Sequence, residues 1–450
     1  MRILVLSHSS AVDNLGGAER ALLELLDGWR SAEPSLDPFV VSRAPEGHLQ
    51  PELDRRGIPW MNLEFESWVR HRRVTDAEAL YHAAKVDFAA VRSLERLIRE
   101  FEPRLVITNT IVAPWAAIAA KLVGVPHVWL AHEFGTGHEF QLPREAVFTD
   151  IGLLSDAVVA SSRALAEHLA QWVPREQLEV LYPNLQPVSA ERQLSQASWP
   201  FPPRSDALKA VCVGRISESK GQRRLVRAVA KLAAEGIHVQ AALVGSWVER
   251  ERAAIEAMVR AEDLGGRIAF VGEVDDPSGY FEAADVAVVA SDSEGFGRVT
   301  VEAMAMGVPV IGANTGANVE LITHGETGRL FDLSDDASLA SALRHYSTDR
   351  VALVENGRAA RSTLLENLAS RHQLSDLLPR LHAVAESGSA PVSKIPSIMM
   401  SWLSLPDTAL EIIEKSGAMI DPRTSRTWRI GSLALAIPRR LLRTLRGRAR

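Results

Sequence analysis

Short apolar runs alternate with amphipathic segments along the first part of the chain. Five of these runs have the length and the β-branched content of buried strands, and they lie at residues 2–6, 39–42, 105–108, 125–130 and 157–160. Apolar positions recur at helical spacing over residues 18–28 and 94–100. This alternation predicts an α/β fold with a parallel, doubly wound sheet.

The pattern breaks near residue 183 and then begins again. Prolines among serine, glutamine and alanine over residues 186–206 predict an interdomain linker. Beyond it, strands are predicted at residues 210–213, 239–244, 268–271, 286–290 and 308–311, and helices at residues 222–235, 252–262 and 299–306. Two such domains in tandem bind ligands in a cleft at the carboxyl ends of their strands.

The chain is therefore expected to have five parts. They are an N-terminal domain (1–185), the linker (186–206), a C-terminal domain (207–365), a helix that packs back on the N-terminal domain (366–387) and a basic amphipathic tail (388–450). A length of 450 residues supports two cores rather than one.

Composition places the protein among globular chains, with 46% hydrophobic and 24% charged residues. The single cysteine, Cys212, excludes a disulfide framework within one chain and fits a cytoplasmic location. The apolar run at the N-terminus is too short for a signal peptide. No stretch reaches the roughly 18 apolar residues that a membrane-spanning helix needs.

Charge is distributed unevenly. Residues 421–450 hold nine arginines and one aspartate, a net charge of +8, which leaves about −14 on the other 420 residues. An acidic body argues against nucleic-acid binding. The arginines of the tail alternate with leucine and isoleucine, which suits the anionic inner face of a membrane. A disordered solubilising tail or an oligomer contact fits the same composition.

The strongest chemical signal is the segment 293–302, which follows a predicted buried strand and opens a helix. Gly295 and Gly297 allow a sharp turn and a close backbone approach to a ligand. The helix start offers free N–H groups and a positive dipole end to a phosphate. Glu294 and Glu302 flank that start, and their carboxylates suit the hydroxyl donors of a sugar.

A second signal follows the strand at residues 210–213. Arg215 and Lys220 lie on a loop bounded by Gly214 and Gly221. Two cations five residues apart on such a loop can hold a diphosphate, the arginine as a fork and the lysine as a point charge.

Together these motifs resemble the signature of the retaining GT-B glycosyltransferases of family GT4, over residues 1 to about 365. The resemblance implies two Rossmann-like domains that face each other across a cleft, with the acceptor on the N-terminal side and a nucleotide-diphosphate sugar on the C-terminal side. It implies that Arg215 and Lys220 hold the donor diphosphate, that Glu294 binds the donor sugar and that Glu302 binds the ribose. Backbone amides would cradle the phosphates at Phe296, Gly297 and Val299.

The N-terminal domain carries further parts of the resemblance. Gly16 and Gly17 form a turn after the first strand that is similar to the family's first loop, which faces the diphosphate. His132 ends a strand where the family has a cleft histidine near the transferred sugar, and a catalytic role is implied for it together with Glu294, Arg215 and Lys220. The segment 316–320 departs from the family's Gly-Gly-x-x-Glu pattern, because its second glycine is Ala317.

The implied reaction retains the anomeric configuration by front-face attack, with the leaving diphosphate helping to deprotonate the acceptor. No metal or cofactor is expected, because the sequence has no Asp-x-Asp motif and no His/Cys cluster with ligand spacing. The acceptor would be a saccharide or a lipid-linked molecule of cell-surface polysaccharide or glycolipid synthesis. Trp68 and the basic residues of loop 64–76, namely Arg70, His71, Arg72 and Arg73, are candidates to meet an anionic acceptor.

Two other functions remain open. An epimerase of nucleotide sugars on the same fold would release an altered sugar without any acceptor. A non-catalytic subunit would bind the sugar nucleotide without turnover.

Overall fold

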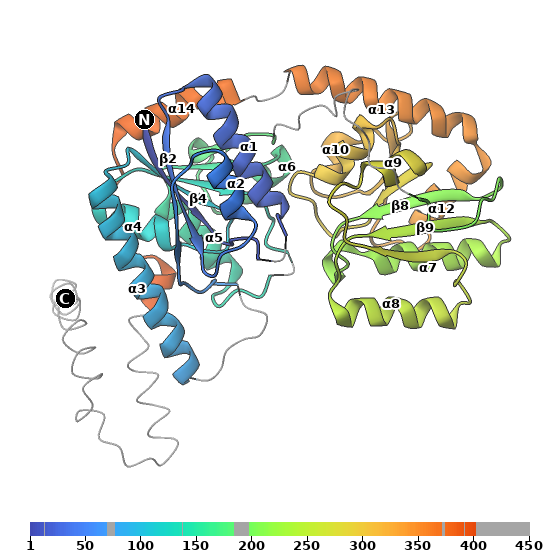
Figure 1. Cartoon of the computed structure of the whole chain (residues 1–450), viewed down its shortest axis with the longest axis horizontal. Helices are drawn as coiled ribbons and strands as arrows, with labels where there is room; N and C mark the ends of the chain where they lie inside the picture. The colour runs from blue at the N-terminus through green and yellow to red at the C-terminus, as the bar shows by residue number, and fades with distance from the viewer. Residues whose placement is uncertain are drawn as a thin grey trace, which may run out of the picture.

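A computed structural model of the chain describes residues 1–12, 14–69, 77–136, 138–183, 198–370, 374–390 and 392–401. Most of the expected linker and all of the arginine-rich end of the tail lie outside the described residues. Figure 1 shows two α/β bodies side by side, with the N-terminal one in blue to teal and the C-terminal one in green to yellow.

The N-terminal domain is built on a seven-stranded sheet in the order β3-β2-β1-β4-β5-β6-β7, with every neighbouring pair parallel. Its strands are β1 (Arg2–Ser7), β2 (Asp37–Arg43), β3 (Trp60–Leu63), β4 (Leu105–Asn109), β5 (His127–Ala131), β6 (Ala157–Ala160) and β7 (Leu178–Val180). Its helices are α1 (Gly17–Ala32), α2 (Leu49–Arg55), α3 (Ala77–Phe101), α4 (Trp115–Val123), α5 (Arg144–Leu154), α6 (Arg163–Leu169) and the short η1 (Arg175–Gln177).

The C-terminal domain repeats this plan with six parallel strands in the order β10-β9-β8-β11-β12-β13. Its strands are β8 (Leu208–Val213), β9 (Val239–Val244), β10 (Ile268–Gly272), β11 (Val286–Val289), β12 (Val310–Ala313) and β13 (Gly328–Phe331). Its helices are η2 (Glu218–Lys220), α7 (Gln222–Ala234), α8 (Glu249–Ala261), α9 (Ser278–Ala283), α10 (Arg298–Ala305), α11 (Asn318–Leu321), α12 (Ser338–Thr348) and α13 (Arg350–Ser370).

The chain then returns to the N-terminal domain. Helix α14 (Leu374–Ser387) packs Leu377, Leu378 and Leu381 into the same apolar cluster as α1. Figure 1 shows this helix in orange beside α1, away from α13, which runs along the edge of the C-terminal domain. The break between the two bodies therefore falls after Ser370 rather than near residue 365. The Asp150 carboxylate then accepts the N–H groups of Ser397 and Ile398, at 2.8 and 2.9 Å.

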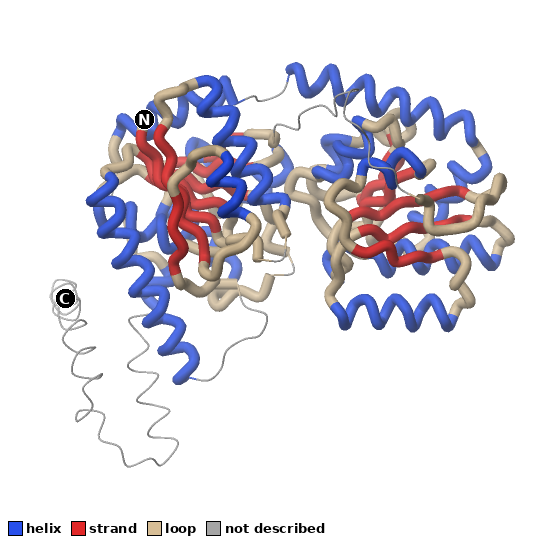
Figure 2. The backbone as a smooth tube through the Cα atoms, in the orientation of Figure 1, coloured by secondary structure: helices blue, strands red, loops and turns tan. Residues whose placement is uncertain are grey.

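Helices cover both faces of each sheet, which Figure 2 shows as red strands between blue helices. In β1, Ile3 and Val5 pack toward the α1 and α14 side, whereas Leu4 and Leu6 pack toward the α3, α4 and α5 side. Strands buried on both faces are continuous apolar runs, which is why the sequence pattern located them. The expected α/β fold with two doubly wound parallel sheets is confirmed. Among the helices of the described residues, none is long and apolar enough to cross a bilayer.

Several elements differ from the expectation. The helix expected at residues 94–100 is only the end of α3, which begins at Ala77. The pattern also missed β3, β7 and β13, three of the four outer strands, in which several positions are half-buried.

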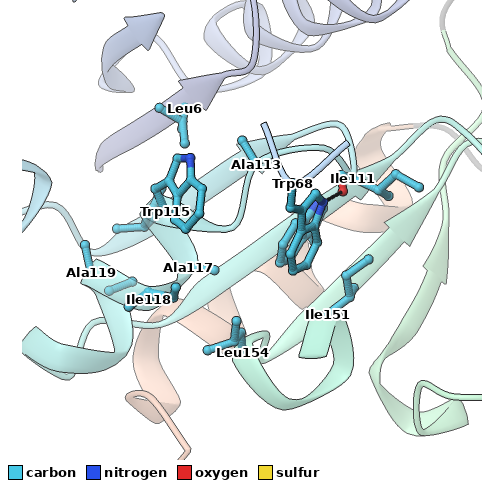
Figure 3. Packing of buried hydrophobic residues seen from close by; sticks show 14 of the residues in the cluster. Leu6, Trp68, Ile111, Ala113, Trp115, Ala117, Ile118, Ala119, Ile151 and Leu154 are labelled. Atoms are coloured by element: carbon cyan, nitrogen blue, oxygen red, sulfur yellow. Dashed lines mark hydrogen bonds between the residues drawn. The ribbon is translucent and has the colours of Figure 1, made fainter. Parts of the chain in front are cut away.

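Trp68 does not face an acceptor, so this part of the expectation is wrong. Its side chain is fully buried, its indole N–H donates to the Ile111 carbonyl oxygen at 2.6 Å, and its ring stacks on Trp129 with centroids 5.9 Å apart. Figure 3 shows Trp68 and its bond to Ile111 within the packed interior. A large ring that buries its one polar atom against a backbone carbonyl belongs to the core. The basic residues 70–73 of the same loop lie outside the described residues.

Replacing Trp68 with alanine should lower the unfolding free energy of the N-terminal domain by about 3–5 kcal/mol, because the change leaves a large cavity and an unpaired carbonyl. Thermal unfolding followed by tryptophan fluorescence measures it. The matched control is Trp60→Ala, since Trp60 is only half-buried and donates to Asp54 at the surface. Unchanged stability of Trp68→Ala would contradict this role in the core.

Candidate functional site

The candidate site lies where the two sheets turn their carboxyl ends toward each other. The strand order reverses at β1/β4 in one sheet and at β8/β11 in the other, and these are the switch points at which such sheets bind ligands. Polar contacts cross the cleft here. They join Thr136 to Ser293 at 2.6 Å, Asn14 to Glu273 at 2.8 Å and Arg298 to Glu24 at 3.0 and 3.1 Å.

The structure brings the two motifs of the C-terminal domain together. The Lys220 ammonium lies 2.7 Å from a carboxylate oxygen of Glu294, and the Ser291 hydroxyl donates to that same oxygen at 2.5 Å. Lys220 ends η2 after β8, and Glu294 lies on the loop after β11, the neighbouring strand. Both groups are half-buried, so the lysine positions the carboxylate while its own charge stays accessible from the cleft.

Arg215 lies on the loop between β8 and η2 and is exposed. Its guanidinium forms no hydrogen bond or ion pair with any residue that the structure describes. An arginine that is held by no partner beside a lysine suits a doubly charged ligand, for which it supplies a planar fork of donors.

Helix α10 begins at the second glycine of the loop. Gly297 is its N-cap residue, with a φ of 82°, and no side chain caps the helix. The first N–H groups of the helix, including that of Val299, are therefore available to an anion. The Phe296 ring is buried against Tyr182, with centroids 6.1 Å apart, so only its backbone can serve a ligand.

Glu302 lies one turn into α10. Its carboxylate is 4.0 Å from Arg298, and burial raises its pKa although Arg298 and Arg20 oppose that effect. Gly16 and Gly17 form the opposite wall, as the N-cap and first residue of α1. A Cβ on Gly17 would lie 3.6 Å from the Arg298 side chain, so the two domains nearly touch at this point.

His132 directly follows β5, and its Nε2 lies 2.8 Å from the side-chain oxygen of Asn109, which ends β4. Burial, His8 and Arg298 lower the pKa of His132 to about 4, so the ring is neutral at physiological pH. Burial, with a smaller contribution from the Glu19 charge, raises the pKa of the next residue, Glu133, to about 7. The polar floor of the cleft thus holds a neutral imidazole beside a carboxyl group that titrates near neutrality.

At Gly295 the backbones of the two domains come into close contact. A Cβ built on it would lie 1.8 Å from the carbonyl oxygen of His132 and 3.5 Å from the Ser161 hydroxyl. Any side chain at this position would collide with the other domain. Glycine here therefore allows the backbone of the Glu294 loop to rest on the backbone beside His132.

The departure from the family's pattern at Ala317 does not disturb the loop. Ala317 has φ −67° and ψ −16°, which any residue adopts, and its N–H donates to the Glu294 carbonyl oxygen at 2.8 Å. Gly316, with φ +56°, is the residue that approaches the Glu294 backbone. The position whose backbone conformation requires glycine is therefore Gly316, and it is a glycine in this chain.

The sequence motifs did not identify the residues that tie the domains together behind the cleft. The Glu320 carboxylate accepts the Tyr182 hydroxyl and the N–H groups of Arg163 and Ala164 at the start of α6. Glu320 lies in the quoted segment 316–320, but nothing in the sequence indicates a partner 138 positions away. In the part of the chain that the structure describes, no three His, Cys, Asp or Glu side chains are placed to hold a metal ion.

Two family models match the chain. "Glycosyltransferase Family 4" matches residues 15–184, and "Glycosyl transferases group 1" matches residues 196–362, so together they account for about three quarters of the sequence. The first match contains the Gly16 turn and His132. The second contains Arg215, Lys220, Glu294 and Glu302.

Curated relatives and solved structures agree with these models. The chain is 34% identical over 169 residues to a lipopolysaccharide core biosynthesis mannosyltransferase of Rhizobium leguminosarum bv. viciae, a match to 36% of this chain and 47% of that protein. It is 28% identical over 381 residues to a glycogen synthase of Mycobacterium tuberculosis, covering 81% and 90% of the two chains. The fold of the Anabaena protein HepE, solved in complex with UDP-glucose, superposes with a TM-score of 0.65 at 22% identity, over 86% of this chain and 100% of that one.

Replacing Gly295 with alanine should prevent full closure of the cleft, because the added methyl group would overlap the His132 carbonyl oxygen. Small-angle X-ray scattering should show a larger radius of gyration, while the melting temperatures of the two domains stay near those of the unaltered protein. The matched control is Gly265→Ala, since a Cβ on Gly265 meets nothing within 4 Å. An unchanged radius for Gly295→Ala would contradict the closed arrangement.

Proposed function

The chain belongs to the group 1 glycosyltransferases, and from this premise we propose that it moves a sugar from a nucleoside-diphosphate donor to a saccharide or lipid-linked acceptor of cell-surface polysaccharide or glycolipid synthesis. The observation that carries the proposal is the pairing of Lys220 with Glu294 beside the unpaired Arg215 and the uncapped start of α10. This arrangement places two cations and free amides next to a carboxylate that can accept the hydroxyls of a sugar.

Each group has a role in the proposed reaction. Lys220, Arg215 and the N–H groups around Gly297 stabilise the negative charge that grows on the departing diphosphate. Glu294 holds the sugar hydroxyls, and Glu302 holds the ribose. His132, neutral and oriented by Asn109, lies on the acceptor side beside the transferred sugar.

The reaction proceeds with retention at the anomeric carbon and without a metal ion. The diphosphate leaves on the same face from which the acceptor attacks, and the protein's cations neutralise it. The name of the Rhizobium relative supports a surface saccharide as acceptor, and the UDP-glucose complex of the Anabaena protein supports a uridine nucleotide as donor.

Calorimetric titration with UDP, GDP and ADP tests the donor site. One nucleotide should bind in the micromolar range with or without EDTA, and Lys220→Ala should weaken it by about 1.5–3 kcal/mol, which is typical for a lost hydrogen bond to a charged group. Lys220→Ala should also lower the rate of sugar transfer. Its melting temperature should stay within a few degrees of that of the unaltered protein.

The matched control is Lys231→Ala, because Lys231 is an exposed lysine in the last turn of α7, away from the loop that holds Lys220. No binding to any of the three nucleotides would refute the glycosyltransferase proposal. Tight binding without turnover on a broad acceptor panel would favour the non-catalytic subunit, and an altered free sugar would favour the epimerase.

The arginine-rich tail adds a membrane contact to the proposal. Its nine arginines and interleaved apolar residues bring a cytoplasmic enzyme to the anionic inner face of the membrane, where a lipid-linked acceptor resides. The full chain should sediment with phosphatidylglycerol vesicles at low salt, and a chain ending at Asp421 should stay in the supernatant. Equal sedimentation of the two chains would exclude this role for the tail.

A further inference from the structure

Four charged side chains from the two domains gather beside the start of α10. Arg20 and Glu24 lie four residues apart on α1, and Arg298 and Glu302 lie four residues apart on α10. Residues at this spacing share one face of a helix, so each helix carries a cation and an anion that can pair with each other. The two helices belong to different domains, and their charged faces meet across the cleft.

Arg298 pairs across the cleft rather than along its own helix. Its two terminal guanidinium nitrogens donate to both carboxylate oxygens of Glu24, at 3.0 and 3.1 Å. Its Nε atom is 4.0 Å from a carboxylate oxygen of Glu302, which is too far for a hydrogen bond. The side chains of Arg298 and Glu24 are only 20% and 26% exposed, so this forked pair is largely shielded from water. In this arrangement the guanidinium is therefore committed to Glu24.

Glu302 keeps its carboxylate oxygens free of hydrogen bonds. Among the residues that the structure describes, none donates to them, and the ion-pair partner of Glu302 is Arg298 at 4.0 Å. Burial raises the pKa of Glu302, whereas Arg298 and Arg20 act in the opposite direction. The two cations thus favour the charged carboxylate without occupying its oxygens. A carboxylate in this state can accept both hydroxyls of a ribose.

The Arg298 side chain lies along the N-terminal wall of the cleft. A Cβ on Gly17, the first residue of α1, would lie 3.6 Å from Cδ of Arg298, so the side chain passes in contact with the start of α1. Glu24 then receives the guanidinium two turns further along that helix. The position of this cation relative to Glu302 therefore depends on how close the two domains lie.

We propose that Glu24 draws Arg298 away from Glu302, so that the ribose site is complete only while the cleft is closed. The inference rests on the function proposed above, and it makes Arg298 a positioning residue. When the domains separate, Arg298 keeps only Glu302, one turn away on α10, and the guanidinium then covers the oxygens that a ribose needs. Closure returns the arginine to Glu24. A nucleotide that binds Glu302 therefore favours the closed cleft by the same factor by which closure favours the nucleotide.

The charge of Glu24 and its hold on Arg298 affect nucleotide binding in opposite directions. An anion beside a site for a diphosphate repels the ligand, so charge alone makes Glu24→Gln bind a nucleotide more tightly. Loss of the hold on Arg298 makes the same variant bind more weakly, because the guanidinium then covers Glu302. The sign of the change in affinity therefore separates the two effects.

Calorimetric titration of the full chain tests the inference, with whichever of UDP, GDP and ADP binds best and with the 2′,3′-dideoxy form of that nucleotide. Glu24→Gln should weaken binding of the complete nucleotide by about tenfold, which lies within the usual range for coupling between two sites. The dideoxy form should bind Glu24→Gln and the unaltered protein equally, because it lacks the hydroxyls that Glu302 accepts. A general loosening of the cleft would weaken both nucleotides.

Arg298→Met tests the route from Glu24 to Glu302. Added to Glu24→Gln, it should restore part of the lost affinity, because the group that covers Glu302 is gone and the two substitutions are not additive. A role limited to holding the domains together would give no such recovery. Glu235→Gln is the matched control and should leave nucleotide binding unchanged. Glu235 forms a similar forked pair with Arg344, at 2.6, 2.7 and 2.9 Å, but within the C-terminal domain.

The inference is overturned if Glu24→Gln leaves nucleotide affinity unchanged or raises it, if the dideoxy form is weakened as much as the complete nucleotide, or if Arg298→Met restores nothing in the Glu24→Gln protein. In all of these outcomes the unaltered protein binds a nucleotide, so the function proposed above stands. An unaltered protein that binds none of the three nucleotides would refute that function, and this inference with it.

Discussion

The arrangement of the site depends on one backbone contact, the approach of Gly295 to the carbonyl oxygen of His132. The sheets of the two domains share no strand, so their relative position is set by this contact together with the Arg298–Glu24 pair and the contact of Glu320 with Tyr182. Because no side chain separates the two backbones here, Glu294 and His132 lie on opposite sides of a single van der Waals contact. The loop of Glu294 and the end of β5 therefore belong to one site.

The positive charge of Arg298 adds an ion pair between the two domains near this contact. The guanidinium forms two hydrogen bonds with Glu24 of the other domain, lies 4.0 Å from Glu302 and lowers the pKa of His132. One half-buried cation thus links the expected ribose ligand, the cleft histidine and the interface between the domains. Removing its charge would alter all three together, whereas Lys220 and Glu294 form a pair within one domain.

The sequence predicts those features that depend on short stretches of chain. Strands buried on both faces and the loop of Glu294 each fit within about ten residues, so periodicity, glycines and carboxylates located them. Features made by distant partners could not be predicted in this way. Trp68 lies among basic residues and has the local pattern of a surface loop, but its burial depends on Ile111 and Trp129. The contact between Tyr182 and Glu320 likewise exists only once both domains have folded.

The carboxyl edge of the N-terminal sheet is built at a cost to stability. His8 after β1, Thr110 after β4 and Ser161 after β6 each bury a polar atom that has no hydrogen-bond partner in the structure. Each such atom costs about 1–3 kcal/mol. Thr110 also has a φ of 78°, which is unfavourable for a β-branched residue. Three strands of this sheet thus end beside a buried polar atom without a partner, and such strain persists only where the surrounding structure holds it in place. At the C-terminal edge Lys220 and Ser291 satisfy Glu294, whereas the buried Nδ2 atom of Asn318, after β12, has no partner among the described residues.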